Sequence, residues 1–582
     1  MKGGVTINQI AEFSKIFDEQ PKDLNAYLTG ISRSNLLKAM RFFPEFSNPN
    51  SNLKTTKEFF EMFFCAENSP YGNEVYSKII SYEQKINSQL IIISPQSCLQ
   101  LFEFCYDNLT EEDIQTKEEA ERNVFKALLF SNEENTKKEL LSGYSTENLG
   151  PDIRLAAMQL SQSFPYSDII NYEITEVLAC QIIKSVYLFE FLESNPNTKI
   201  LLLKFLEQFN FKNWKDYLKG ILPIQFSILN SNRKAHIDIY IPKDENFQNS
   251  CDFIEKLIMS DIEILKSYDF RKIRSKPFYK ISDGVYGIIF PLFVVELIHK
   301  GLFFKLAEIN KTLGKDEKVK GEFRSFYCNE FSERFLLYKT LNSIYKNRYI
   351  EFSGEEIKDN HRNFDAEPDY YIRNGNSLFL FESKDIFINA KIKPTYDFVQ
   401  YEAEFKKKLY YEDKDGKIDN KAVLQLTKNI ERALTKQLPF DSNYKVHSLY
   451  IYPILVLHDH QFNVTGLNVL VNQWFKDELE KLKAKGINID KVQPITIINI
   501  DTFIFHQDLF RDRKIKLETV IDGYFKFIKF DPKRKYKDEN ECKKFILRTV
   551  VPFSNYLQNY IEDKKIRKVP KMLMDQGFKL FN

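Results

Sequence analysis

The chain has 582 residues, which is more than one hydrophobic core usually organises, so we expect two to four domains. A hydrophobic fraction of 43% and a charged fraction of 28% are ordinary for a folded protein and argue against a disordered chain. With 83 basic and 81 acidic residues the net charge is +2, which neither indicates nor excludes nucleic acid, because binding requires only a local basic patch.

Local patterns argue against a secreted or membrane protein. The seven cysteines are scattered and form no CxxC pair, which disfavours both a disulfide framework and a zinc finger. No apolar run follows Lys2, so we expect no signal peptide. The longest apolar run, Val285–Val295, is interrupted by Pro291 and is shorter than the roughly 20 residues of a membrane span. We therefore expect a cytoplasmic protein with no membrane partner.

The N-terminal half is predicted to be mostly helical. Leu36, Leu37, Met40 and Phe43 recur at helical spacing, and the alternation over His236–Ile241 predicts one strand or a short hairpin. We interpret residues 1–270 as a recognition, sensor or partner-docking domain. Residues 271–317, which contain the long apolar run, are predicted to be a buried helix pair that connects the two halves.

From residue 318 the pattern changes to strands mixed with helices. Tyr349–Phe352 is a predicted strand, and the apolar segments Asp369–Ile372 and Ser377–Phe381 flank Asn374-Gly375, which is a strong hairpin signal. Alternating strands and helices predict an α/β domain over residues 318–530.

The same kinds of pattern predict the elements in the rest of that domain and in the C-terminal tail. A turn at residues 413–416 leads into a helix over Ala422–Leu434, and His447–Leu457 and Ile495–Ile500 are predicted buried strands. Residues 531–582 hold thirteen Lys or Arg against seven Asp or Glu, a net charge of +6, and we expect a basic helical extension there. Its densest basic cluster is Lys564, Lys565, Arg567, Lys568 and Lys571.

One hairpin carries the residue types needed to cut a phosphodiester. That reaction needs a divalent cation, carboxylates that hold it, and a group that manages the attacking water. Asp369 begins one predicted strand, and Glu382 and Lys384 lie near the end of the next. Because side chains alternate along a strand, Glu382 and Lys384 share one face. Asp369 and Glu382 are therefore predicted to bind Mg²⁺, with the carbonyl of Ser383 as a further oxygen ligand.

This pattern resembles the PD-(D/E)xK nuclease superfamily, which includes many restriction endonucleases and repair nucleases. The resemblance covers about residues 321–530 and implies a restriction-endonuclease-like fold, a mixed central sheet flanked by helices. It implies that Asp369 and Glu382 bind Mg²⁺, which Mn²⁺ can replace, and that Lys384 is catalytic. Chance triplets of the ExK form also occur, as at Glu356-Ile357-Lys358, so the hairpin context is what distinguishes Glu382-Ser383-Lys384.

Two flanking helices extend the resemblance. Many members carry a glutamate on the first helix of the domain, and Glu333 fits that place better than Glu330, although a solvent-exposed helix position is an equal alternative. Some branches place a glutamine on the helix after ExK. Gln425 occupies such a place, beside a buried stripe of Val423, Leu426 and Ile430, and an ordinary polar helix position is again the alternative.

Basic residues near the hairpin are candidates for contact with phosphates of the nucleic-acid backbone. They lie between the ExK strand and the end of the glutamine helix: Lys391, Lys393, Lys406, Lys407, Lys408 and Lys428.

The sequence predicts a Mg²⁺-dependent endonuclease that acts on DNA, in restriction, anti-phage defence or a mobile element. RNA as the substrate is not excluded. The main alternative is a non-cleaving nucleic-acid-binding or scaffold protein. A homodimer, or a partner protein bound through the N-terminal region, is compatible with either function.

Overall fold

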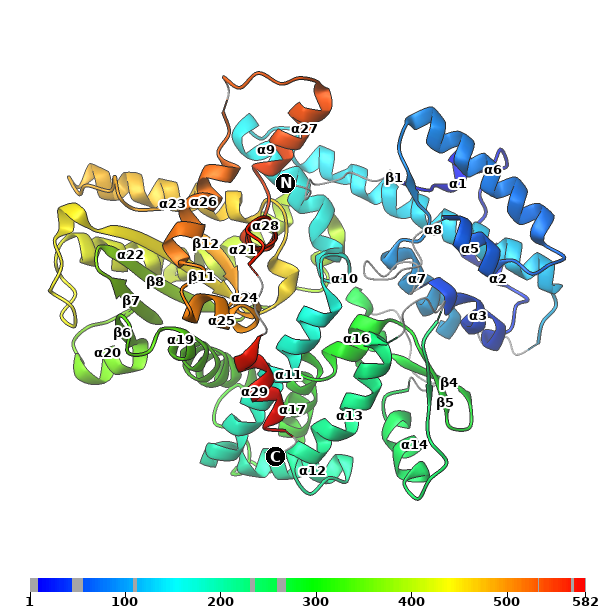
Figure 1. Cartoon of the computed structure of the whole chain (residues 1–582), viewed down its shortest axis with the longest axis horizontal. Helices are drawn as coiled ribbons and strands as arrows, with labels where there is room; N and C mark the ends of the chain where they lie inside the picture. The colour runs from blue at the N-terminus through cyan, green and yellow to red at the C-terminus, as the bar shows by residue number, and fades with distance from the viewer. Residues whose placement is uncertain are drawn as a thin grey trace.

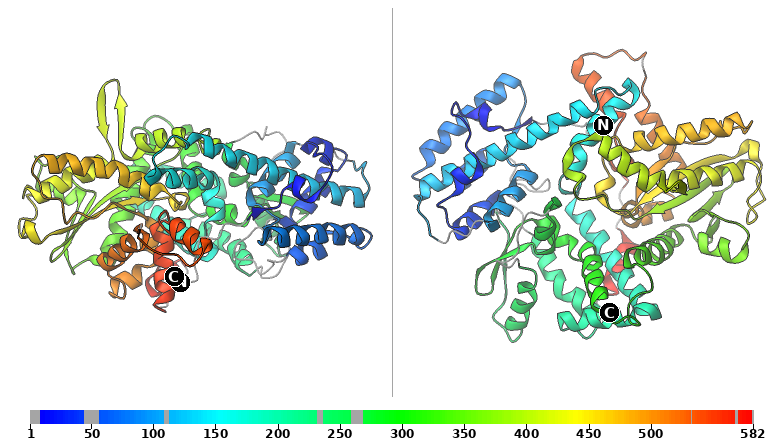
Figure 2. Two further views of the ribbon diagram at one scale, coloured as in Figure 1. Left: turned by 90° about the horizontal axis from the view of Figure 1, so that it is seen from above. Right: turned by 180° about the vertical axis from the view of Figure 1, so that it is seen from behind.

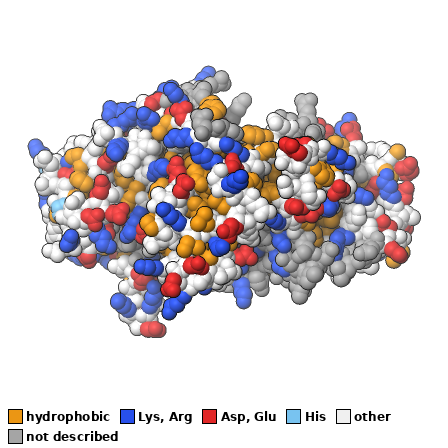
Figure 3. Space-filling model, turned by 90° about the horizontal axis from the view of Figure 1, so that it is seen from below, with side chains coloured by type: hydrophobic (Ala, Val, Ile, Leu, Met, Phe, Trp, Pro, Cys, Tyr) orange, Lys and Arg blue, Asp and Glu red, His pale blue; other side chains and the backbone are white. Residues whose placement is uncertain are grey.

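Helices make up 61% of the protein, and a mixed five-stranded sheet formed by strands between residues 350 and 499 lies on the left in Figure 1. The computed structural model describes residues 9–43, 56–107, 112–230, 236–258, 268–531, 533–566 and 570–580. None of the helices in these ranges is long and apolar enough to cross a membrane. On the face drawn in Figure 3, acidic and basic side chains are interspersed, with hydrophobic side chains between them.

The N-terminal half is helical, as predicted. Its elements before residue 230 are β1 (Gln9–Ile10), α1 (Phe13–Ile16), α2 (Leu24–Leu28), α3 (Arg33–Met40), α5 (Thr56–Phe63), α6 (Ser69–Ile86), β2 (Leu90–Ile91), α7 (Pro95–Asp107), α8 (Lys117–Ser145), α9 (Pro151–Ser163), α10 (Ser167–Ile170), α11 (Ile174–Ser194), α12 (Lys199–Phe209) and α13 (Trp214–Leu229). Helix α8 starts at a capping box in which Thr116 and Glu119 satisfy each other's backbone amides. It runs from the outer group of helices toward the centre of the molecule (Figure 1).

The predicted buried helix pair over 271–317 is wrong in its first half. After α14 (Phe247–Glu255) and α15 (Arg271–Ser275), strands β4 (Phe278–Ser282) and β5 (Val285–Ile288) form a hairpin, and β3 (Asp238–Tyr240) pairs with β5. The turn is Asp283-Gly284, with Gly284 at a φ of +71°. An Asp-Gly pair is a hairpin signal that the apolar run masked. The helices begin later, with α16 (Pro291–Glu296) and α17 (Lys300–Thr312).

The central sheet has the strand order β12-β11-β8-β7-β6. Its strands are β6 (Ile350–Ser353), β7 (Tyr370–Asn374), β8 (Ser377–Lys384), β11 (Tyr450–Leu457) and β12 (Thr496–Asn499). Strands β8, β11 and β12 are parallel, whereas β6 and β7 run antiparallel to their neighbours. The predicted hairpin at Asn374-Gly375 is confirmed, because Asn374 pairs with Ser377 across Gly375 and Asn376.

Alternation along β8 separates two hydrophobic cores. Leu378 and Leu380 belong to one core with helices α21 (Phe398–Leu409), α22 (Ala422–Leu434) and α23 (Leu467–Ala484). Phe379 and Phe381 face the other core with α19 (Tyr338–Tyr345), α24 (Ile500–Phe505) and α26 (Leu517–Ile528). We call these the Leu380 face and the Phe381 face of the sheet.

The remaining elements lie around this sheet. They are α18 (Phe323–Phe326), η4 (Tyr327–Leu337), α20 (Gly354–Asn360), β9 (Tyr411–Lys414), β10 (Lys417–Asn420), α25 (Gln507–Arg511), α27 (Glu539–Arg548), α28 (Phe553–Asp563) and α29 (Lys571–Phe578). The β9–β10 hairpin projects from the body (Figure 2). The tail is helical, as expected, but Arg567 and Lys568 of its predicted basic cluster lie outside the described residues.

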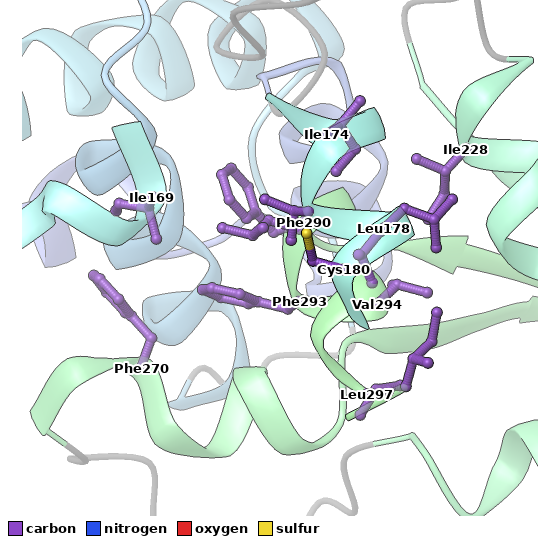
Figure 4. Close-up of a cluster of buried hydrophobic side chains, with 14 of the residues drawn as sticks. Ile169, Ile174, Leu178, Cys180, Ile228, Phe270, Phe290, Phe293, Val294 and Leu297 are labelled. Atoms are coloured by element: carbon purple, nitrogen blue, oxygen red, sulfur yellow. The ribbon is translucent and has the colours of Figure 1, made fainter. Parts of the chain in front are cut away.

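The predicted domain boundaries do not separate hydrophobic cores. Side chains of α11 such as Leu178 and Cys180 meet Phe293 and Val294 of α16 in one buried cluster (Figure 4). The same core continues to Phe381 and the α26 side of the sheet. On the Leu380 face, Leu160 of α9 packs with the helices of the sheet. The N-terminal helices and the sheet therefore support each other.

Candidate active site

The β7–β8 hairpin brings Asp369 and Glu382 together. Tyr370 pairs with Phe381, and continuing this antiparallel register by one step places Asp369 opposite Glu382. The backbone N–H of Ser383 donates a hydrogen bond of 2.6 Å to Asp369 Oδ2. Asp369 therefore contacts the ExK segment directly, as the sequence predicted from the Asn-Gly turn.

Glu382 and Lys384 form a close pair at the end of β8. The Glu382 side chain is fully buried, and its Oε1 accepts a hydrogen bond of 2.6 Å from Lys384 Nζ. Within the described part of the chain, Glu382 Oε2 is buried without a hydrogen-bond partner. A buried carboxylate oxygen without a partner is costly to ionise, and a bound cation would offset that cost, so this atom suits a cation.

Three acidic groups crowd this position and shift one another's pKa. Burial raises the pKa of Asp369, although Lys384 opposes that shift. Burial and then the neighbouring Asp369 raise the pKa of Glu382 well above its usual value. Burial and then Asp369 also raise the pKa of Glu333, to about 8. Burial alone would lower the pKa of Lys384, but Glu382 and Asp369 outweigh it and raise that pKa. A bound divalent cation would offset the electrostatic repulsion between these carboxylates.

The structure favours Glu333 over Glu330 as the helix glutamate. Both lie in η4, which has π-helical hydrogen bonding, a rare geometry that is frequent at functional sites. Glu330 accepts a hydrogen bond of 2.7 Å from Arg334 on the same helix. Glu333 instead interacts electrostatically with Asp369 and Lys384. No sequence pattern indicated the π-helical hydrogen bonding of η4.

Gln425 lies on the Leu380 face of the sheet, the face that also carries Glu382 and Lys384. The predicted stripe of Val423, Leu426 and Ile430 is buried in the core of that face, as expected. Gln425 Oε1 is buried and has no hydrogen-bond partner among the described residues. One turn later, Asn429 Nδ2 donates to the carbonyl of Ala366, three residues before Asp369. This side of α22 is therefore hydrogen-bonded to the loop that leads to Asp369.

Three further residues near the site were not among those predicted from the sequence to belong to it: Glu367, Asp385 and His458. Glu367 is half-buried, and its charge raises the pKa of both Asp369 and Glu333. His458 Nε2 lies 2.7 Å from Ser383 Oγ on the Phe381 face, behind the ExK segment. Asp385 lines a cavity of about 50 Å³ on that same side, together with His299, Arg324 and His458. The Glu-x-Asp spacing could have indicated Glu367, but the other two depend on contacts between distant segments.

The predicted phosphate-binding lysines fare differently. The prediction for Lys393 is wrong, because its side chain is buried and pairs with Asp168 at 3.0 Å and Asp269 at 2.8 Å. Three others are exposed or half-buried but paired with carboxylates: Lys406 with Glu402, Lys407 with Glu412, and Lys428 with Asp365. Lys391 is exposed and Lys408 is half-buried, and phosphate contact by either stays a prediction.

The carboxylates do not form a closed cage. Among the described residues, three or more candidate ligand side chains converge within 4.8 Å only at Cys65, Glu67 and Glu118. A cation held by Asp369 and Glu382 would thus take further ligands from backbone oxygen and water, as Mg²⁺ usually does. Comparison with known proteins found no matching family model, no matching curated protein and no matching solved structure.

Proposed function

We propose that residues 318–530 form a Mg²⁺-dependent nuclease of the PD-(D/E)xK type, with a restriction-endonuclease-like fold, that cuts within DNA strands. The observation that carries the proposal is the arrangement at the ends of β7 and β8. Asp369 accepts a hydrogen bond from the backbone N–H of Ser383. Glu382 Oε2 is buried near Lys384 and has no hydrogen-bond partner among the described residues. Acidic ligands beside one lysine are the groups that metal-assisted hydrolysis requires.

In this proposal Asp369 and Glu382 hold the cation, and Ser383 adds its carbonyl oxygen. A bound Mg²⁺ or Mn²⁺ would polarise the phosphate and lower the pKa of a coordinated water. Lys384 lies on the same face as Glu382 and already donates to it, so the ammonium suits donation to the attacking water or to a phosphate oxygen. Glu333 and Gln425 complete the walls of the site from two different helices.

The biological setting is part of the proposal and rests on architecture alone. A nuclease domain fused to a large helical region suits restriction, anti-phage defence or a mobile element, with the helical region recognising a target or a partner. The alternatives are a non-cleaving nucleic-acid-binding or scaffold component of a complex, and a nuclease that acts on RNA. The ion pairs of Lys406, Lys407 and Lys428 favour the scaffold, because these lysines must leave carboxylates before they can bind phosphates.

A cleavage assay tests the proposal. Plasmid DNA is incubated with Mg²⁺ or Mn²⁺, with EDTA as the metal-free arm, and the Asp369→Ala and Lys384→Ala proteins are compared with the wild type. We expect each substitution to slow cutting at least ~10²-fold, the effect typical of losing one transition-state contact. Lys358→Ala is the matched control, because Lys358 ends the chance triplet Glu356-Ile357-Lys358 and is exposed on α20.

The other outcomes separate the alternatives. Equal cutting by the wild type and both site variants would mean that a contaminating nuclease, and not this site, cuts the DNA. Cutting of RNA but not DNA would keep the site and change the substrate. If the wild type cuts neither plasmid DNA, linear DNA nor RNA with either metal, a non-cleaving scaffold becomes the better hypothesis.

A further inference from the structure

Helices α26 and α27 follow each other in the C-terminal part of the chain (Figure 1). Side chains of α26, of α27 and of the link between them line a basic hollow. It has a volume of about 440 Å³, and five cationic side chains line it: Lys526, Lys529, Lys533, Arg534 and Arg548. The other lining residues are Phe530, Phe545 and a single acid, Asp531. We propose that this basic hollow binds a single polynucleotide strand, with the phosphates on its cations and a base on Phe530.

The cations of the hollow are poorly neutralised by the protein itself. Among the residues that the structure describes, Lys526, Lys529 and Lys533 form no ion pair, and only Arg534 reaches a carboxylate, Glu541 at 3.2 Å. Five like charges around one concave surface repel one another, and a polyanion that enters the hollow removes that repulsion.

Arg548 shows the same imbalance at the inner wall. Its guanidinium lies 4.1 Å from the centre of the Phe545 ring, and its Nε is buried without a hydrogen-bond partner among the described residues. Burial, and then the charge of Arg534, lower the pKa of Arg548. The inner wall thus holds an unsatisfied donor and an uncompensated cation, both of which suit a phosphate oxygen.

The aromatic residues distinguish a polynucleotide from other anions. Phe530 is 53% exposed, and it lines the hollow together with three lysines. Bases stack on exposed aromatic rings while cations follow the backbone, which is how single strands are bound without sequence preference. An anionic membrane would require a broader apolar face than this one ring. A duplex keeps its bases stacked inside, so it cannot use Phe530.

This inference goes beyond the proposed cleavage. Helix α26 packs against the Phe381 face of the sheet, whereas Glu382 and Lys384 lie on the Leu380 face. None of the residues that line the hollow belongs to the candidate active site, so the two are separate. Strand binding there needs neither a metal ion nor catalysis, so the two proposals can fail independently.

Binding is measured without metal, in EDTA, with a fluorescent oligo(dT) of about 20 nucleotides, a length that spans one such groove. The full-length variant Lys526→Gln/Lys529→Gln/Lys533→Gln is compared with Lys315→Gln/Lys318→Gln/Lys320→Gln. The control removes three exposed lysines that also form no ion pair among the described residues, in the link between α17 and α18. We expect the hollow variant to bind at least ~10-fold more weakly, with a salt slope smaller by about 2, because each lost phosphate contact removes ~0.7. The control variant should keep wild-type binding.

Phe530→Ala tests the stacking contact separately. It should weaken oligo(dT) binding about 10-fold and leave duplex binding nearly unchanged, because only an unpaired base reaches the ring. Equal loss in the hollow and control variants would overturn the proposal, since binding would then follow total charge. So would wild-type oligo(dT) affinity in the hollow variant, or a loss confined to binding of vesicles that contain an anionic lipid. Equal loss of duplex and oligo(dT) in Phe530→Ala would overturn the assignment to a single strand.

Discussion

The Ser332 hydroxyl donates a hydrogen bond of 2.6 Å to Asp385 Oδ2, which ties the helix of Glu333 to the residue that follows Lys384. Arg324 donates to the other oxygen of Asp385 at 2.7 Å. Burial alone would raise the pKa of Asp385, but Arg324 and neighbouring groups outweigh it and lower that pKa. This buried carboxylate stays ionised and positions η4 against the end of β8.

We therefore expect Ser332→Ala to impair the site, although Ser332 itself is not one of the predicted metal ligands or catalytic residues. Glu333 is adjacent to Ser332, so a loosened helix should misplace that carboxylate. The apparent Mg²⁺ affinity in the cleavage assay should fall about 10-fold, as for other residues that orient metal ligands. Ser332→Thr should restore it. Ser325→Ala is the control, since Ser325 makes an exposed hydrogen bond to Glu322 at the start of the same helical region. An unchanged Mg²⁺ dependence in Ser332→Ala would show that the bond is only structural.

The raised pKa of Glu333 predicts how stability depends on pH in the metal-free protein. An unfolded glutamate has a pKa near 4.5, whereas that of folded Glu333 is about 8. The folded state therefore binds more protons between these values, so its stability falls as the pH rises from about 4.5 to about 8. In EDTA, Glu333→Gln should flatten this fall and raise the melting temperature at pH 8 by roughly 3 °C. Thermal unfolding from pH 5 to 9 measures it. Parallel curves for the two proteins would mean that Glu333 is not buried near Asp369.

Gln425 and Asn429 offer a contrast within one helix. Gln425 Oε1 has no hydrogen-bond partner among the described residues, so Gln425→Ala should cost less than ~1 kcal/mol of stability. Asn429 is fully buried and donates to the carbonyl of Ala366, so Asn429→Ala should cost about 1–3 kcal/mol. Cleavage should follow the opposite order in kcat at saturating Mg²⁺, with Gln425→Ala the slower enzyme. Normal cleavage by Gln425→Ala, once its concentration of folded protein is matched, would remove Gln425 from the site.

Local sequence signals were sufficient for the centre of the site. The Asn-Gly turn and the alternation of β8 depend on neighbours within a few residues, so they predicted that Asp369, Glu382 and Lys384 come together. Helix α22 has the predicted bounds, Ala422–Leu434, because one continuous apolar stripe defines it. The roles of these residues in metal binding and catalysis stay predictions.

What could not be predicted depends on distant contacts. The sequence preferred Glu333 to Glu330, but it did not indicate the burial of Glu333 near Asp369 or the π-helical geometry of η4, which a 3.6-residue period does not describe. The β4–β5 hairpin was not predicted because strand β5 is apolar on both faces, and such an apolar run resembles a buried helix. The misassignment of Lys393 has the same origin, since its partner Asp168 is 225 residues away in the sequence.

Lys393 should therefore affect stability and not nucleic-acid binding. Asp168 accepts from Arg274 at 2.5 Å and from Lys393 at 3.0 Å, and together they outweigh burial and hold the pKa of Asp168 well below its usual value. Asp168→Asn leaves both cations underneutralised and should cost about 3–5 kcal/mol in the free energy of unfolding, measured in urea. Lys393→Met should also destabilise the protein, by less, because its apolar stem is retained and Arg274 still neutralises Asp168.

The control for Lys393 is Lys391→Met, an exposed lysine two residues earlier, which should leave stability within ~0.5 kcal/mol of the wild type. In EDTA, Lys393→Met should keep both the wild-type affinity for DNA and its salt slope. A phosphate contact would instead reduce that slope by about 0.9 on duplex DNA. A reduced slope with an unchanged urea midpoint would restore Lys393 as a nucleic-acid contact, and it would require the ion pairs with Asp168 and Asp269 to open on binding.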